Sequence, residues 1–165
     1  MSRIIFVSNL LPLKPEKNIN EEIQLKERIG GYSSGLIKFY KENNTAWFGW
    51  TGLEKKQLLL QEKEDLNSAL QKRDCYPIYL KRKERENYLE GFSNKVLWPL
   101  FHYFSGKSSF REEYWKAYVK VNQRYADELE DIIKEGDKIW IHDYHLMLLP
   151  QMLRKKFPDL TIGYF

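Results

Sequence analysis

The chain has 165 residues, of which 42% are hydrophobic, so it is long enough to bury a core and is not disordered as a whole. Its 27 basic and 23 acidic residues give a net charge of +4, and the positive charges lie in short mixed runs, which argues against a nucleic-acid-binding protein. No apolar run approaches the roughly 20 residues of a membrane span, and the amino terminus does not resemble a signal peptide. The single cysteine, Cys75, allows no disulfide framework and favours a cytoplasmic protein.

The first third of the chain predicts a strand, a long loop, a helix and a second strand. The apolar run 3–7 is typical of a strand. The polar, proline-containing stretch that follows it, as far as 30–31, is expected to be a surface loop. Apolar residues at helical spacing then predict a helix over 32–43, and the aromatic run 46–50 predicts the next strand.

The middle of the chain predicts peripheral helices and one strand. Residues 54–74 are highly charged around a few leucines and are expected to form one or two helices at the periphery. The run 76–80 is predicted to be a strand near the edge of a sheet, because Pro77 has no N–H to donate to a neighbouring strand.

The last third predicts a long helix followed by a βαβ unit. Apolar and aromatic residues recur every three or four positions over 110–135, and Gly136 is expected to end that helix. A strand over 138–142, a helix over 150–156 and a strand over 160–165 follow. This alternation predicts an α/β fold with a Rossmann-like parallel sheet and helices on both faces, and such sheets bind ligands beyond the carboxyl ends of their strands.

One short segment places polar groups where that rule expects a ligand. Asp143 follows the apolar run 139–141 and stands between His142 and His145. A carboxylate there can accept hydrogen bonds from sugar hydroxyls or orient a reacting group. The alternative is that Asp143 caps the following helix while a histidine packs in the core. With one further histidine and no cysteine pair, the ligand set is too small to predict a metal site.

The glycine pair and the tryptophans are weaker indications of a site. Gly30 and Gly31 precede a helix and allow backbone amides to approach a phosphate, but they lack the spacing of a dinucleotide or P-loop motif. Tryptophans can stack on the apolar faces of sugar rings, although in strands they are more often part of the core. Trp47 is therefore expected in the core, and for Trp98 both possibilities stay open.

Several segments, taken together and in order, resemble the amino-terminal part of a known enzyme family. They are VSN at 7–9, the glycine pair, WFGWTG at 47–52, GFSNKVLWPLFHY at 91–103, YWKAYVKVN at 114–122 and IWIHDYHLMLLPQMLRKKFP at 139–158. In this order and spacing they are similar to the trehalose-6-phosphate synthases, glycosyltransferase family 20. These retaining enzymes move glucose from UDP-glucose to glucose 6-phosphate. The resemblance covers almost the whole chain.

The resemblance implies a role for three residues. Asp143 would be the catalytic residue at the centre of the sugar-binding site. Gly31 would meet the phosphates of the donor, and Trp98 would line the pocket for the acceptor phosphate.

Two residues depart from the family pattern in that pocket. The family has arginine at the position of Leu10 and a second tyrosine at Leu89, and both would contact the acceptor phosphate. A lost charge-assisted hydrogen bond costs roughly 1.5–3 kcal/mol and a neutral one about 1, so acceptor affinity is expected to fall by about two orders of magnitude or more if no other group compensates. Lys14, in the adjacent loop, is a candidate replacement for the missing charge.

The fold that the resemblance implies is GT-B, in which two Rossmann-like domains face each other across a cleft. Residues 1–165 would form the incomplete amino-terminal, acceptor-side domain, and the donor-binding second domain would be absent from this chain, which alone is expected to be inactive. The complete enzyme would need no metal or other cofactor, would bind only small-molecule substrates, and would be cytoplasmic, with a homo-oligomer left open. The alternatives are a related glycosyltransferase with a different acceptor and a non-catalytic regulatory or binding subunit; Leu10 and Leu89 keep both open.

Overall fold

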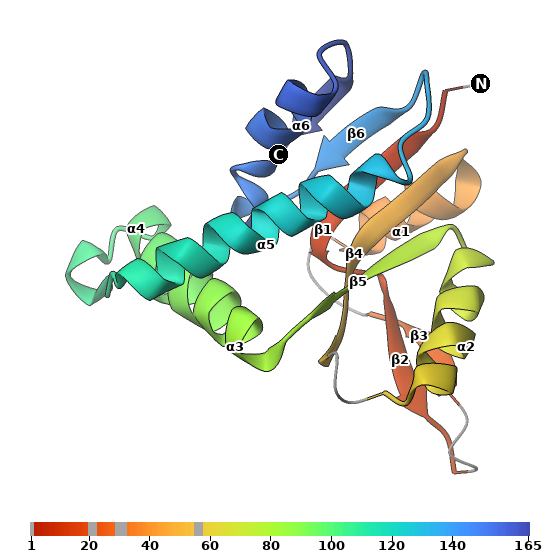
Figure 1. The fold of residues 1–165 in the computed structure, drawn as a ribbon, viewed down its shortest axis with the longest axis horizontal. Coiled ribbons are helices and arrows are strands. Elements are labelled where there is room, and N and C mark those ends of the chain that lie inside the picture. Colours follow the sequence, from red (N-terminus) through yellow and green to blue (C-terminus); the bar gives the residue numbers. More distant parts are fainter. Residues whose placement is uncertain (1, 20–22, 29–32, 55–57) are drawn as a thin grey trace.

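The computed structural model describes residues 2–19, 23–28, 33–54 and 58–165, and it is built around a five-stranded parallel sheet (Figure 1). The strand order is β5-β4-β1-β6-β7. The strands are β1 (Ile4–Leu10), β4 (Thr45–Glu54), β5 (Cys75–Leu80), β6 (Lys138–Ile141) and β7 (Thr161–Tyr164). The predicted Rossmann-like sheet is confirmed, and Pro77 lies in the edge strand β5, as expected.

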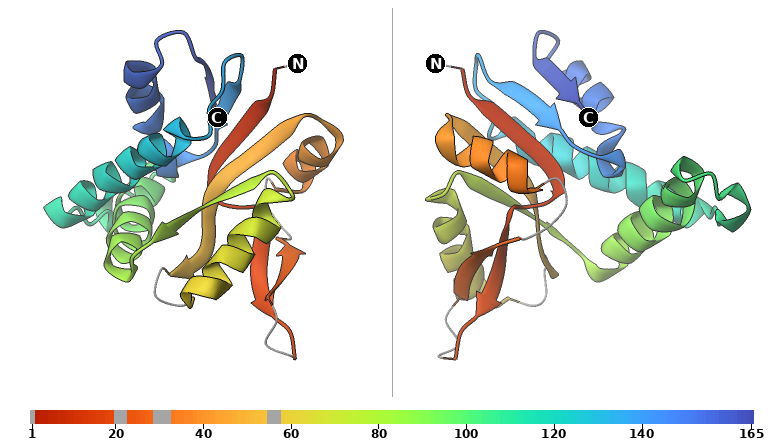
Figure 2. Two further views of the ribbon diagram at one scale, coloured as in Figure 1. Left: turned by 45° about the vertical axis from the view of Figure 1, so that its right-hand side comes forward. Right: turned by 180° about the vertical axis from the view of Figure 1, so that it is seen from behind.

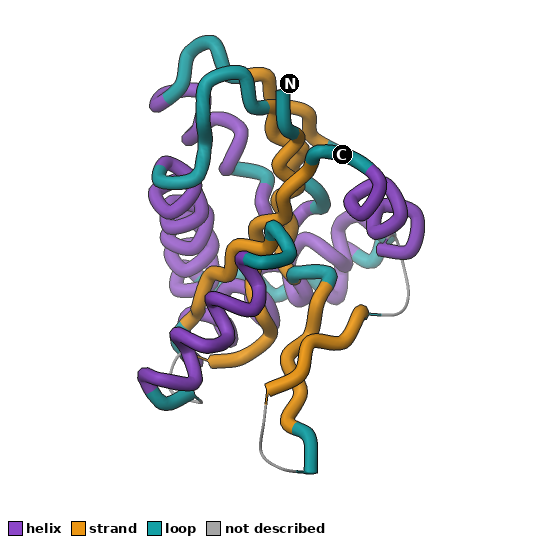
Figure 3. Tube along the Cα trace, turned by 90° about the vertical axis from the view of Figure 1, so that its right-hand side faces the viewer, coloured by secondary structure: helices purple, strands orange, loops and turns teal. Residues whose placement is uncertain are grey.

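The sheet is buried on both faces because side chains alternate along each strand. In β1, Ile5 and Val7 contribute to one core and Phe6 to the other. Helices α5 (Glu112–Glu130) and α6 (Leu149–Lys156) cover the first core, and α1 (Ser33–Glu42) and α2 (Leu60–Gln71) cover the second. Figure 3 shows these helices on both sides of the strands. No helix in the described ranges is long and apolar enough to cross a membrane.

The prediction of a surface loop after β1 is wrong for most of that stretch. Strands β2 (Leu13–Lys17) and β3 (Ile23–Glu27) form an antiparallel pair that extends from the sheet beside α2 (Figures 1 and 2). Leu13 is buried in the second core, and Ile23 and Leu25 pack against it. In both strands, apolar residues alternate with polar ones over only a few positions. Among the neighbouring prolines and charges, this short pattern did not indicate a strand in the sequence.

The segment between β5 and α5 is almost entirely helical. It consists of α3 (Arg82–Arg85), η1 (Glu86–Leu97) and α4 (Trp98–Phe101), followed by the short turn η2 (Ser105–Lys107). The middle part, η1, is wound as a π-helix, and together with α5 it projects from the sheet as an arm (Figure 1). Helix α5 ends at Glu130, one turn before the predicted stop, and Gly136, with φ 83°, lies in the turn that leads into β6.

Gly91 allows η1 and α5 to pack closely. A β-carbon at Gly91 would lie 2.5 Å from Cδ1 of the buried Tyr114 ring on α5, which is closer than carbon atoms approach without displacement. The arm therefore depends on a residue without a side chain at this point.

We expect Gly91→Ala to lower the free energy of unfolding by about 1–3 kcal/mol, because the added methyl overpacks the contact with Tyr114. Gly106→Ala is the matched control, since a β-carbon there would meet no atom within 4 Å, and it should change stability by less than about 0.5 kcal/mol. Urea denaturation followed by circular dichroism measures both. Equal stability of the two variants would contradict the close contact.

Candidate functional site

The candidate site lies where β1 and β6 end side by side. These strands pair in parallel with Val7 opposite Ile141, so the residues that follow each strand meet at one edge of the sheet. The backbone N–H of His142 donates to the carbonyl of Val7 at 2.8 Å, which continues the pairing one step further. Asp143 comes next and leaves the sheet at that edge.

Asp143 has a backbone conformation that side chains other than glycine rarely adopt. Its φ is 78° and its ψ is 158°, a region that costs of order 1–3 kcal/mol for such a residue. Its N–H donates to the carbonyl of Phe165 at 2.7 Å, and its carbonyl accepts from the hydroxyl of Tyr164 at 3.1 Å. Strained backbone that is held in place by its surroundings is typical of functional sites.

The Asp143 carboxylate caps the following turn, which is one of the two roles that the sequence left open, and it also stays partly exposed. Oδ1 accepts the Tyr144 N–H at 2.7 Å and so caps the short turn η3 (Tyr144–Leu146). Oδ2 lies 3.4 Å from Nδ1 of His145, and the side chain is 30% exposed. The carboxylate therefore has one oxygen occupied by the turn and can still be reached by a ligand.

The electrostatic environment keeps Asp143 ionised at neutral pH. Burial raises the pKa of the carboxyl, but His145 and the Tyr144 N–H outweigh it and hold the pKa below its ordinary value. Burial lowers the pKa of His142, whose ring stacks on Phe165. An ionised Asp143 beside a neutral His142 suits a site that accepts hydrogen bonds from hydroxyl groups.

Side chains from α5 fix the turn that carries Asp143. The hydroxyl of Tyr118 donates to the carbonyl of Tyr144 at 2.6 Å and accepts the N–H of Met147 at 3.0 Å. One turn further along α5, the amide of Asn122 donates to the carbonyl of His145 at 3.2 Å. The sequence showed these residues only as part of the apolar face of a helix.

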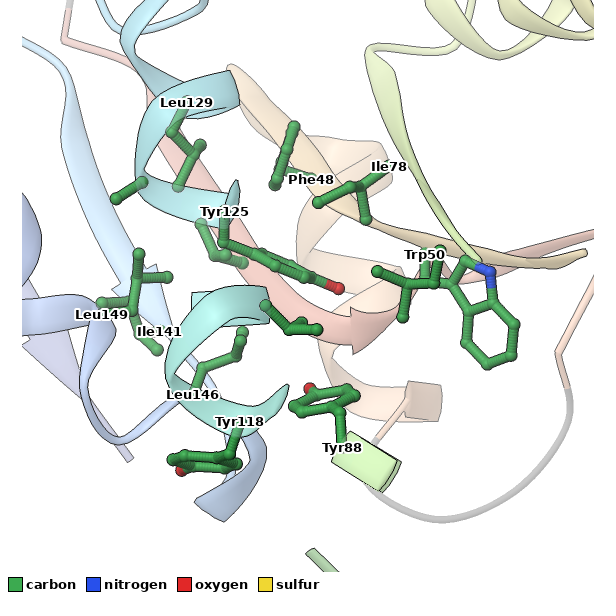
Figure 4. Packing of buried hydrophobic residues seen from close by; sticks show 14 of the residues in the cluster. Phe48, Trp50, Ile78, Tyr88, Tyr118, Tyr125, Leu129, Ile141, Leu146 and Leu149 are labelled. Atoms are coloured by element: carbon green, nitrogen blue, oxygen red, sulfur yellow. The ribbon is translucent and has the colours of Figure 1, made fainter. Parts of the chain in front are cut away.

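Two more buried tyrosines hold the end of β1. Tyr88 of η1 donates to Oδ1 of Asn9 at 3.1 Å, and Tyr125 of α5 donates to the carbonyl of Asn9 at 3.1 Å. Figure 4 shows Tyr88, Tyr118 and Tyr125 in the same core. Burial raises the pKa of Tyr88 well above its ordinary value, so its phenol stays neutral and acts as a donor. Sequence periodicity predicts that such residues are buried but does not show which backbone atoms their hydroxyls reach.

Trp98, at the start of α4, lies close to the Asp143 turn. Its ring centroid is 6.1 Å from that of Tyr144, which stacks on His145, and the Trp98 side chain is among the exposed large hydrophobic residues. Trp98 is therefore near Tyr144, the residue after Asp143, while its ring packs on that of His102 with centroids 3.6 Å apart. Trp47 is buried and donates its indole N–H to Ser8, which confirms the expectation that it belongs to the core.

The other predicted site residues are placed by different elements. Leu10 ends β1 opposite Trp50, and Leu89 lies on η1; both are half-buried and pack against the first core. Their proposed relation to an acceptor phosphate stays a prediction. Gly31 lies outside the described residues. Lys14, the candidate replacement for the missing charge, instead forms an ion pair with Glu16 within the hairpin.

The described residues around Asp143 form no recognisable metal centre. Within the described part of the chain, no three histidine, cysteine, aspartate or glutamate side chains lie close enough together to hold a metal ion. A surface hollow of about 680 Å³ follows α5 from Glu112 to Asp127 and contains none of the predicted site residues.

Fold and site together define a Rossmann-like domain, whose parallel sheet carries a strained carboxylate just after β6, at the edge where such folds bind ligands. Residues 2–165 match the sequence model of glycosyltransferase family 20, so the chain belongs to that family.

The sequences and structures similar to this chain match almost its whole length, but they belong to much longer proteins. It is 37% identical to α,α-trehalose-phosphate synthase [UDP-forming] A of Dictyostelium discoideum, over 99% of this chain and 22% of that protein. It is 39% identical to the enzyme of that name from Schizosaccharomyces pombe, over 99% of this chain and 32% of that protein. A crystal structure of a UDP-forming synthase from Burkholderia xenovorans in complex with glucose-6-phosphate superposes with a TM-score of 0.73 at 30% identity, over 99% of this chain and 33% of that one. The fold is therefore that of the amino-terminal part of GT-B trehalose-phosphate synthases, and the chain spans about a fifth to a third of the length of these relatives.

We expect Tyr118→Phe to lower the free energy of unfolding by about 1–3 kcal/mol, because it leaves the Met147 N–H and the Tyr144 carbonyl without their common partner. Tyr103→Phe, on an almost fully exposed ring, should have an effect below about 0.5 kcal/mol. Thermal unfolding of the two variants beside the wild type measures this difference. Similar stability of the Tyr118 variant and the wild type would show that the hydroxyl does not hold the turn.

Proposed function

We propose that this chain is the acceptor-side part of a UDP-forming α,α-trehalose-phosphate synthase that transfers glucose from UDP-glucose to glucose 6-phosphate. The observation that carries the proposal is the match to glycosyltransferase family 20 along residues 2–165, with Asp143 presented at the edge of the sheet where such folds bind ligands. The donor-binding domain would be supplied by a part of the protein outside these residues.

In this proposal the residues of the chain position the acceptor rather than attack the donor. The ionised Asp143 accepts hydrogen bonds from sugar hydroxyls, and the exposed ring of Trp98 packs against the acceptor. No protein nucleophile is assigned, because the donor phosphate itself would help to remove the proton from the acceptor hydroxyl. The proposed reaction needs no metal ion, and the buried free thiol of Cys75 suits a cytoplasmic protein.

A second candidate function is a related glycosyl transfer to an acceptor without a phosphate. Leu10 favours it, because an apolar residue stands where the resemblance led us to expect a phosphate-binding arginine. The two candidates differ in whether binding depends on the phosphate of the sugar.

We expect the 165-residue chain to bind glucose 6-phosphate, with or without EDTA, and to release no UDP from UDP-glucose in its presence, because it lacks the donor side. Saturation-transfer NMR measures binding, and a coupled assay measures UDP, with an intact relative as the positive control for the assay. Absence of binding would contradict the proposed acceptor site. UDP release that depends on the acceptor would contradict the assignment of the donor site to another part of the protein.

We expect Asp143→Asn to weaken binding of glucose 6-phosphate about tenfold or more, because hydrogen bonds to a charged group contribute roughly 1.5–3 kcal/mol. Asparagine tolerates a positive φ and keeps the oxygen that caps the turn, so the variant should fold. Asp74→Asn is the matched control, since Asp74 also has a positive φ but is exposed after α2. Isothermal titration compares the variants, and unchanged affinity in Asp143→Asn would remove Asp143 from the site.

A further inference from the structure

The end of the arm exposes aromatic side chains, most of which the candidate site does not use. Figure 1 shows this segment, with α4 and the start of α5, projecting away from the sheet. The exposed large hydrophobic side chains between 98 and 115 are Trp98, Leu100, Phe101, Tyr103, Phe104, Phe110 and Trp115. A cluster of exposed apolar side chains of this size is typical of an interaction surface.

This surface continues along one face of α5. Phe110 and Trp115 both pack on Phe92, with ring centroids 6.4 Å and 5.2 Å from that of Phe92. Trp115 also lines the hollow of about 680 Å³ on α5, and Val119 and Asp127 line it further along the helix. Because these residues are spaced by whole turns, they share one face, which leads from the aromatic end of α5 to its carboxyl end.

The aromatic end of this α5 face is basic. Residues 91–111 contain three lysine or arginine residues and no acidic residue. Lys95 and Lys107 are exposed, and neither forms an ion pair within the part of the chain that the structure describes. Their positive charges are therefore not neutralised by a carboxylate of the described residues.

The other end of the α5 face is acidic. Residues 127–135 contain five acidic residues and one lysine. Lys156 of α6 pairs with two of the five. Asp131 and Glu135 are exposed and form no ion pair among the described residues. The two ends of one helix thus carry opposite charges.

A second copy of this chain fits both ends at once. When two α5 helices pack antiparallel about a twofold axis near Val119, the basic end of each copy faces the acidic end of the other. A helix of 19 residues is about 28 Å long, so the two basic ends stay further apart than the roughly 8–10 Å over which exposed charges interact in salt. The exposed ring of Trp115 in each copy is then buried against the partner, and buried tryptophans contribute strongly to such interfaces.

We propose that this α5 face is an interface between two copies of the chain, which pack with their α5 helices antiparallel. The inference does not depend on the proposed function. An anionic membrane surface would also suit the basic, aromatic end, but it would repel the acidic end of the same face. The second copy is the occupant that matches both ends.

Sedimentation velocity of the wild-type 165-residue chain is the first test and needs no variant. The chain is expected to sediment as a dimer, with twice its mass of 19.9 kDa, at micromolar concentrations. The dimer should weaken as salt is added, because salt screens exposed charges. A chain that stays monomeric would overturn the proposal. If that monomer sedimented with vesicles of phosphatidylserine and not with vesicles of phosphatidylcholine, the aromatic end would be assigned to a membrane instead.

Two charge-reversed variants test which surface forms the dimer. Lys95→Glu with Lys107→Glu makes both ends acidic, and Asp131→Lys with Glu135→Lys makes both ends basic. Each variant alone should dimerise about tenfold or more weakly than the wild type, because both contacts in its dimer become repulsive. An equimolar mixture of the two should recover the dimer, since each copy then meets the opposite charge at both ends. Lys38→Glu, on an exposed position of α1, is the control and should leave dimerisation unchanged.

A single cysteine near the proposed twofold axis tests the antiparallel arrangement. Lys120 is exposed beside Val119, and Lys120→Cys should give a disulfide-linked dimer on mild oxidation, because the same position of both copies meets only near such an axis. Lys38→Cys is the control and should stay unlinked; the native Cys75 is buried. A dimer that does not cross-link through Lys120→Cys would overturn the antiparallel packing. A dimer that the charge-reversed variants leave unchanged, or that their mixture does not recover, would overturn this face as the interface.

Discussion

The site depends above all on the backbone of Asp143, which is held at a φ of 78° against an intrinsic cost of order 1–3 kcal/mol. Two hydrogen bonds hold it there. The Asp143 N–H donates to the carbonyl of Phe165, and the hydroxyl of Tyr164 donates to the carbonyl of Asp143. The carboxylate itself caps the turn that follows. Because strain and cap are on one residue, the fold itself fixes the orientation of the carboxylate.

The helices that flank the first core explain how the end of β1 and the turn after β6 keep a fixed relation. Tyr118 donates to the backbone after β6, and Tyr88 and Tyr125 donate to Asn9 at the end of β1. Each phenol buries its ring in the core and donates its hydroxyl to one of these two segments, so core packing and the positions of the segments are coupled. Gly91 belongs to the same arrangement, because it lets η1, which carries Tyr88, pack closely against α5.

The sequence by itself determined the strands of the parallel sheet, the main helices, the burial of Trp47 and the position of Asp143 at a strand end, because these follow from the spacing of apolar residues along the chain. It did not determine the hairpin after β1, whose apolar residues become interpretable only when the second core lies beneath them. It also did not reveal the hydroxyl contacts of the buried tyrosines. Those contacts join residues that are far apart in the chain, so only the tertiary structure decided them.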